Sequence, residues 1–104
     1  MNYSIEVYVA DNGRCPYEDW FASLDPKTQA RVESRVARLR SGNFGDWKPV
    51  GDGVCELRLQ FGAGYRVYYG RIDNRIVLLI TGGSKRTQKR DIQTVKAIWK
   101  TYQK

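Results

Sequence analysis

CELRLQFGAGYRVYYGRIDNRIVLLITGGSKR, residues 55–86, decides the fold of this chain because it predicts three consecutive strands joined by two tight turns. Apolar and polar residues alternate through residues 55–69, on either side of a glycine-rich loop at 62–64, as they do in strands with one buried face. Asp73-Asn74 supplies the second turn. The nearly continuous apolar run at 76–81 indicates an interior strand that is covered on both faces.

The lengths of the two turns predict which side chains share a face of this sheet. The three-residue glycine loop would place Arg58 opposite Tyr68 and Gln60 opposite Arg66. The two-residue turn would place Arg66 opposite Thr81. We therefore expect a cationic working face, separate from the apolar face, whose members come from three segments of the chain: Arg58, Arg66, Tyr68, Lys85 and Arg86.

The other segments predict one more strand and three helices. Residues 3–9 alternate like a strand, and Pro16 can open a short helix. Asp25-Pro26 is a helix start, with Asp as the N-cap, and the helix reaches Ser41-Gly42. A short strand is expected around Trp47–Val50, in a glycine-rich connection. The C-terminal helix carries an apolar stripe and a basic side; the stripe comprises Ile92, Val95, Trp99 and Tyr102, and the basic side Lys89, Arg90, Lys96 and Lys100.

Composition limits the classes of protein that the chain can belong to. Its 104 residues fit one domain, and no apolar run approaches the length that a membrane span needs. The N-terminus lacks the basic region of a signal peptide, and two isolated cysteines suit a reducing cytoplasm. There is no histidine, so we expect no metal site. The net charge of +7 suggests a polyanionic partner.

The available residue types also limit the chemistry. A Ser-His-Asp site is impossible without histidine, and Gly82-Gly83-Ser84-Lys85 lacks the spacing of a P-loop. Arginine, lysine and tyrosine on a sheet can still act on RNA, which carries its own nucleophile in the 2′-OH. Fixed cations stabilise the charge that builds up on the phosphate, and a Lys or Tyr with a lowered pKa can transfer a proton. The same residues would also suit passive RNA binding.

Two motifs carry a resemblance to a known family. GYRVYY (64–69) and LLITGGSKRTQKRDI (78–92) resemble the RelE/HigB-type toxins of type II toxin–antitoxin modules, in the phage-associated addiction module killer protein branch. The resemblance implies one RelE-like α+β domain over residues 1–104, in the order β-α-α-β-β-β-α, with an antiparallel-dominated sheet backed by helices. It further implies a cytoplasmic, ribosome-dependent mRNA endoribonuclease that needs no metal or other cofactor.

The resemblance also implies partners and site residues. The partners are mRNA, the ribosome and a cognate antitoxin of the helix-turn-helix type, with operator DNA reached only through the antitoxin complex and no membrane. Two other functions stay open, a ParE-like inhibitor of DNA gyrase and a passive RNA-binding domain. The residues to which we assign catalysis are Arg58 and Arg66 as phosphate clamps, Tyr68 for stacking or proton transfer, and Lys85; Lys85 or Arg86 serves the leaving group or the RNA backbone. Those to which we assign RNA binding are Lys48, Arg86, Lys89 and Arg90.

Overall fold

A five-stranded sheet forms the centre of the molecule in the computed structural model, which describes residues 2–103. Its strands lie in the order β1-β5-β4-β3-β2. β1 runs parallel to β5 and every other neighbouring pair is antiparallel, which confirms the predicted α+β class and the antiparallel-dominated sheet. The strands are β1 (Ser4–Val7), β2 (Trp47–Gly51), β3 (Val54–Leu59), β4 (Tyr65–Ile72) and β5 (Ile76–Gly83).

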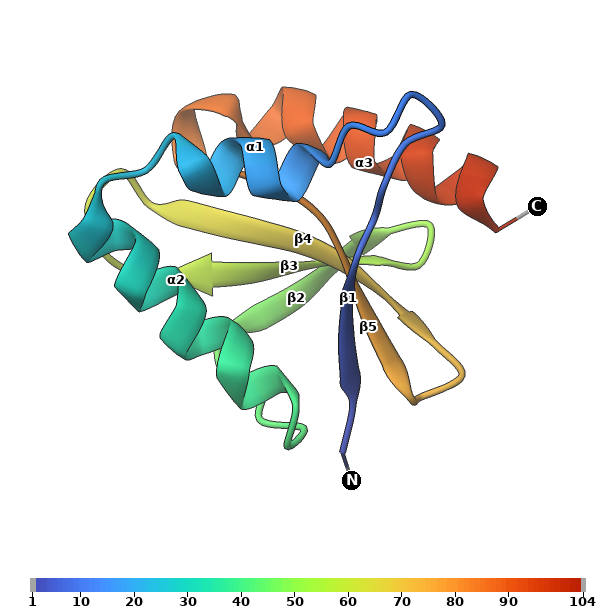
Figure 1. Ribbon diagram of the computed structural model, residues 1–104, viewed down its shortest axis with the longest axis horizontal. Coiled ribbons are helices and arrows are strands. Elements are labelled where there is room, and N and C mark those ends of the chain that lie inside the picture. Colours follow the sequence, from blue (N-terminus) through green and yellow to red (C-terminus); the bar gives the residue numbers. More distant parts are fainter. Residues whose placement is uncertain (1, 104) are drawn as a thin grey trace.

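Helices cover both faces of this sheet (Figure 1). α1 (Pro16–Ala22) and α2 (Pro26–Leu39), which begin at the two predicted helix starts, pack on one face. Asp25 caps α2, where its side chain accepts a hydrogen bond from the Thr28 N–H. α3 (Gln88–Tyr102) follows a short 3-10 turn, η1 (Lys85–Thr87), and packs on the other face.

Each face of the sheet therefore has its own apolar core. Val77 and Leu79 of β5 belong to the core under α1 and α2, and Leu78 and Ile80 to the core under α3. This confirms that residues 76–81 form an interior strand. The prediction of an open cationic face was wrong for most of that face, because Val95 and Trp99 of α3 cover it with apolar side chains. The end of the face that carries Arg58 and Arg66 stays partly exposed.

The register between β3 and β4 differs from the predicted one. Leu59 pairs with Tyr65, so the connecting loop has five residues, Gln60–Gly64, rather than three. Gly62 and Gly64 both have positive φ, at +54° and +71°, which lets the loop fold on itself. Arg58 consequently lies opposite Arg66 rather than Tyr68, and Glu56 lies opposite Tyr68.

The register between β4 and β5 also differs. Asp73 and Asn74 take positive φ as a tight turn requires, but the ladder resumes with Ile72 opposite Ile76. An irregularity next to Tyr68 adds one more residue, so Arg66 faces Gly83 rather than Thr81. The partner of Arg66 is thus Arg58 rather than Gln60 on β3, and Gly83 rather than Thr81 on β5, a shift of two residues in each case. Since side chains alternate with a period of two, the predicted faces are preserved although the partners are not.

Three further expectations can be compared with the structure. The short strand near Trp47–Val50 is present as β2. Tyr102, expected on the buried stripe of α3, is 44% exposed and stacks on the Trp99 ring at 5.9 Å between centroids. Across residues 2–103, no helix combines the length and apolarity that crossing a membrane would require.

Candidate functional site

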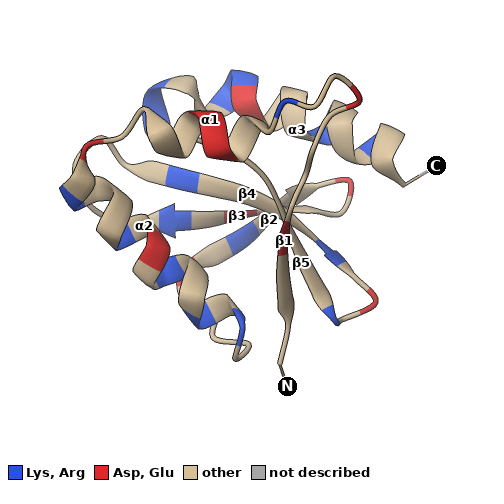
Figure 2. Ribbon diagram, viewed as in Figure 1, with Lys and Arg blue, Asp and Glu red and all other residues tan. Residues whose placement is uncertain are grey.

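Basic residues gather at one end of the sheet, on the side that α3 covers. The pairing places Arg58 opposite Arg66, and Lys48 of the edge strand β2 opposite Glu56, so all four side chains belong to one face. Figure 2 shows one basic position on each of β2, β3 and β4 on the side of the sheet away from the β4–β5 turn, and a second one on β4 close to that turn. The predicted convergence of Arg58 and Arg66 is therefore present, with Arg66 at its centre.

Arg66 is fixed by contacts from beneath. Its Nε lies 3.5 Å from Oε1 of Glu56, which is fully buried, and its Nη1 donates to the Gly64 carbonyl. Gln88 at the start of α3 donates from Nε2 to the same Glu56 oxygen at 2.7 Å. The Arg66 side chain keeps 12% exposure. A buried carboxylate thus forms an ion pair with a guanidinium whose Nε and Nη2 have no hydrogen-bond acceptor within residues 2–103.

Lys85 lies next to Arg66, and the glycine at position 64 allows this proximity. A Cβ at Gly64 would lie 3.1 Å from Nη1 of Arg66 and 3.3 Å from Cβ of Lys85. The Lys85 N–H also donates to the Ala63 carbonyl at 3.3 Å, which joins η1 to the loop before β4. Lys85 is exposed. The backbone places Lys85 beside the anchored Arg66 guanidinium, and two cations so close to one another suit a phosphodiester group.

Arg58 is already paired with an acid. Its Nη2 lies 2.9 Å from Oδ1 of Asp46, and Gln60 donates to the other Asp46 oxygen at 2.7 Å. The hydrogen bond from Gln60 and then that from Arg58 hold the pKa of Asp46 below its ordinary value. Arg58 therefore shares its charge with a carboxylate that the sequence analysis did not single out. Asp46 precedes β2 by one residue, and no local pattern connects it with Arg58.

Tyr68 is fully buried beneath α3. Burial raises the pKa of its hydroxyl, and the nearby carboxylates of Glu56 and Asp91 raise it further. The prediction that Tyr68 stacks on a base conflicts with this burial, and the raised pKa makes the phenol a weak proton donor. The structure assigns its ring to the core between the sheet and α3.

The other predicted RNA-binding residues extend the basic surface away from Arg66. Arg86, Lys89 and Arg90 are exposed and line a shallow hollow on η1 and the first turn of α3. Lys48 is exposed on the edge strand. Arg86, Lys89 and Arg90 follow Lys85 along the chain, and Lys48 lies opposite Glu56 across the sheet.

Glu56 is the site residue that the sequence analysis missed. It occupies a position on the predicted working face, between Val54 and Arg58 in the alternation of β3. A carboxylate that shares one face of a sheet with arginines indicates a counter-charge for them, so the alternation in β3 could have identified Glu56 in this role. Within residues 2–103 no three His, Cys, Asp or Glu side chains cluster as a metal site would require.

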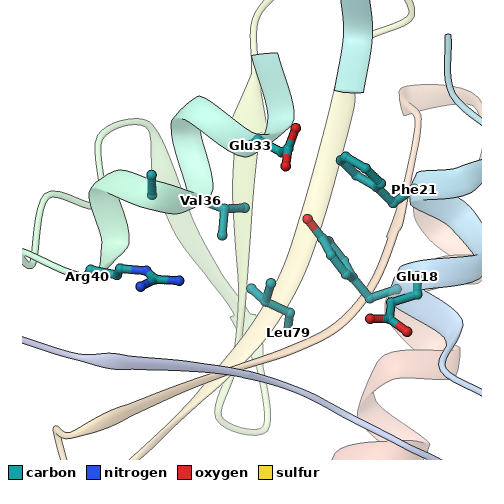
Figure 3. Close-up of a pocket in the computed structure, with 8 residues that line it drawn as sticks. Glu18, Phe21, Glu33, Val36, Arg40 and Leu79 are labelled. Atoms are coloured by element: carbon teal, nitrogen blue, oxygen red, sulfur yellow. The ribbon is translucent and has the colours of Figure 1, made fainter. Parts of the chain in front are cut away.

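A second surface feature lies on the opposite face of the molecule. Figure 3 shows a hollow between α1 and α2, with Leu79 at its floor and Phe21 and Val36 on its walls. Glu18 and Glu33 lie at its rim, and the charge of Glu33, after burial, contributes to raising the pKa of Tyr17 to about 12. Arg40 also lines this hollow, but the two carboxylates at its rim repel a polyanion, so this hollow does not suit RNA.

Comparison with known proteins gives two matches. Residues 19–103 match the family described as "Phage derived protein Gp49-like (DUF891)". An uncharacterized protein of Haemophilus influenzae is 41% identical over 83 residues, which cover 79% of this chain and 84% of that protein. The family match spans α2 through α3, and so includes every residue of the basic end of the sheet.

Proposed function

The chain belongs to the Gp49-like family of phage-derived proteins, a family of the toxin–antitoxin type, and from this premise we propose that it is a toxin that cleaves mRNA on the ribosome. Membership itself supports a toxin with an antitoxin partner. The narrower proposal, a RelE/HigB-type ribonuclease, draws its support from the chemistry of the basic end of the sheet.

The observation that carries the proposal is the anchored Arg66 beside Lys85. Glu56, Gln88 and Gly64 hold the guanidinium in place, so little conformational entropy is lost when a phosphate binds it. Preorganised positive charge is the contribution that a metal-independent phosphodiester cleavage needs most, because negative charge accumulates on the non-bridging oxygens in the transition state.

In the proposed reaction, the 2′-oxygen of the RNA forms a bond to phosphorus while the bond from phosphorus to the 5′-oxygen breaks. The products are a 2′,3′-cyclic phosphate and a free 5′-OH. Arg66 stabilises the negative charge on the phosphoryl oxygens, and Lys85 gives a proton to the leaving 5′-oxygen. The proton of the 2′-OH passes to solvent, or to a ribosomal group that acts as base.

The remaining predicted residues take supporting roles in this proposal. Arg58 contacts the RNA backbone with a charge that Asp46 partly offsets, and Tyr68 supports the strand that carries Arg66 rather than touching RNA. Lys48, Arg86, Lys89 and Arg90 bind backbone phosphates of mRNA or of the ribosome. The antitoxin is of the helix-turn-helix type, and operator DNA is bound only by the antitoxin complex.

Cleavage of mRNA on programmed ribosomes tests the proposal. We expect Arg66→Ala to reduce the rate by about 100-fold or more, as removal of one charge-stabilising donor does elsewhere. Arg75→Ala is the matched control, because Arg75 is an exposed arginine in the turn at the other end of β4. Equal rates for Arg66→Ala and wild type would remove Arg66 from the reaction.

Induced expression separates the proposal from the two alternatives. Rapid arrest of translation supports the ribonuclease. DNA damage and SOS induction without mRNA cleavage would instead indicate a ParE-like gyrase inhibitor. RNA binding with no growth defect would indicate a passive RNA-binding domain.

A further inference from the structure

A second cationic hollow, of about 270 Å³, lies between α2 and the loop that joins β3 to β4. No residue lining it in the described structure is acidic. It occupies the flank of α2 opposite Glu33 and Val36, which face the hollow with the acidic rim. The lining residues are Arg31, Ser34, Arg35, Arg38, Leu59, Gln60 and Phe61. We call this feature the arginine hollow.

Two of its three guanidinium groups are held in place by the fold. The guanidinium carbon of Arg31 lies 4.7 Å from the centre of the Phe61 ring, a cation–π contact. Arg35 donates from Nη1 to the Arg58 carbonyl at 2.8 Å and from Nη2 to the Phe44 carbonyl at 3.3 Å. These contacts use carbonyls and a ring rather than carboxylates. They fix the positions of the cations without neutralising them.

The charge of the arginine hollow is poorly compensated. Within residues 2–103, none of its three arginines forms an ion pair. Asp46, whose charge does reach Arg35, is already bound to Arg58. Burial lowers the pKa of the Arg35 guanidinium, and the neighbouring charge of Arg38 lowers it further. Clustered, repelling cations of this kind favour a bound anion.

The arginine hollow is linked to the candidate active site by the loop that joins β3 to β4. Gln60 and Phe61 begin the loop that ends at Gly64, and the position of Gly64 adjoins both Arg66 and Lys85. One five-residue loop therefore carries the arginine hollow at one end and the Arg66–Lys85 pair at the other. A single strand that crosses this loop would meet cations on both sides.

We propose that the arginine hollow is a second phosphate-binding subsite, which holds the backbone of single-stranded RNA outside the cleaved bond. The identity of the ligand as RNA rests on the proposed function. RNA is favoured over an acidic protein segment because the Arg31 guanidinium, seated on Phe61, offers a flat cationic surface on which a base can stack. Sequence preference is not expected, since every base has a stacking face.

Binding of a cleavage-resistant RNA tests the subsite. The probe is a fluorescent single-stranded 2′-O-methyl RNA of about 12 nucleotides, a length in the range that single-strand binding sites occupy. Wild type is compared with Arg31→Ala/Arg38→Ala by fluorescence anisotropy at several salt concentrations. Arg40→Ala/Arg75→Ala is the matched control, because it removes the same charge at exposed positions outside the arginine hollow.

We expect the Arg31→Ala/Arg38→Ala variant to bind about tenfold or more weakly than the control variant. Its slope of log K against log salt should also be shallower by about 1.4, which corresponds to two lost phosphate contacts on a single strand. Circular dichroism checks that both variants are folded. Equal losses in the two variants would overturn the proposal, because binding would then follow net charge alone.

Two further outcomes separate this subsite from the proposed function. Hollow-dependent RNA binding by a wild type that does not cleave mRNA would overturn the ribonuclease and leave the subsite standing. Arg66-dependent cleavage with RNA binding that is unaffected by Arg31→Ala/Arg38→Ala would overturn the subsite alone. Hollow-dependent binding of a polyglutamate peptide, without binding of the RNA, would show that the hollow receives an acidic protein segment and would overturn the subsite too.

Discussion

Glu56 lies beneath the basic end of the sheet, where its carboxylate is fully buried and contacts both Arg66 and Gln88. Glu56 lies in β3, and its contacts with Arg66 of β4 and Gln88 of α3 tie these three elements together at the candidate active site. It does not reach solvent, so in the proposed reaction it acts on RNA only through Arg66, as a positioning residue.

We predict that Glu56→Gln reduces mRNA cleavage about 10- to 100-fold, because a displaced guanidinium no longer meets the phosphate. The free energy of unfolding should fall by about 3 kcal/mol, since Arg66 stays largely buried without a counter-charge. Cleavage on programmed ribosomes and urea unfolding measure the two effects.

Tyr68→Phe is the matched control for Glu56→Gln. The Tyr68 hydroxyl is buried close to Glu56, whose charge raises its pKa, but it forms no hydrogen bond of good geometry in the described structure, so its removal breaks no well-formed hydrogen bond. Unchanged cleavage by Tyr68→Phe, next to a loss in Glu56→Gln, would attribute the effect to the Arg66 counter-charge. Loss of cleavage in folded Tyr68→Phe would restore Tyr68 as a catalytic residue.

At the scale of the elements, each of the two helical layers packs a tryptophan side chain against a glycine of the sheet. A Cβ at Gly82 in β5 would overlap the Trp20 ring of α1, and a Cβ at Gly70 in β4 would overlap the Trp99 ring of α3. α1 has only seven residues, so its docking depends strongly on this contact.

We predict that Gly82→Ala lowers the free energy of unfolding by about 1–3 kcal/mol, the usual cost of overpacking a core. The physical reason is that Trp20 must leave its place on β5, which loosens α1. Denaturant unfolding measures the loss. A double-mutant cycle with Trp20→Leu gives the control, since the alanine should cost less where the indole is absent. An equal cost in both backgrounds would contradict the assignment to Trp20.

At the scale of the whole molecule, three buried tyrosines make stability depend on alkaline pH. Burial is the first cause that raises the pKa of Tyr17 to about 12 and the pKa values of Tyr68 and Tyr69 higher still. In the unfolded chain, a tyrosine loses its proton near pH 10. Each folded-state pKa lies above its unfolded value. The contribution of these tyrosines to the free energy of unfolding is therefore fully present below about pH 10 and decreases as the pH rises further.

We predict that the free energy of unfolding falls above about pH 10, by up to about 1.4 kcal/mol per pH unit for each buried tyrosine. Urea unfolding between about pH 8 and pH 11, with tyrosinate absorbance as a second signal, measures the effect. Tyr17→Phe should make the decline shallower. Stability that is constant across this range would contradict the burial of these hydroxyls.

The sequence by itself determined the elements and the faces of the sheet. Alternation, the proline and aspartate at the start of α2, and the glycines of the turns act within a few residues, so they can be read locally. The sequence also determined that Arg58, Arg66 and Tyr68 lie on one face. The predicted register was wrong by two residues, and a shift of two residues leaves every side chain on the same face.

Only the tertiary structure decided which of those residues reach solvent and what they contact. α3 buries Tyr68, Asp46 pairs with Arg58, and Glu56 and Gln88 anchor Arg66. The arginine hollow likewise forms between a helix and a loop that lie far apart in the chain. These contacts join residues 10 to 32 positions apart. They depend on loop lengths and on how the helices pack on the sheet, and no local pattern in the chain records either.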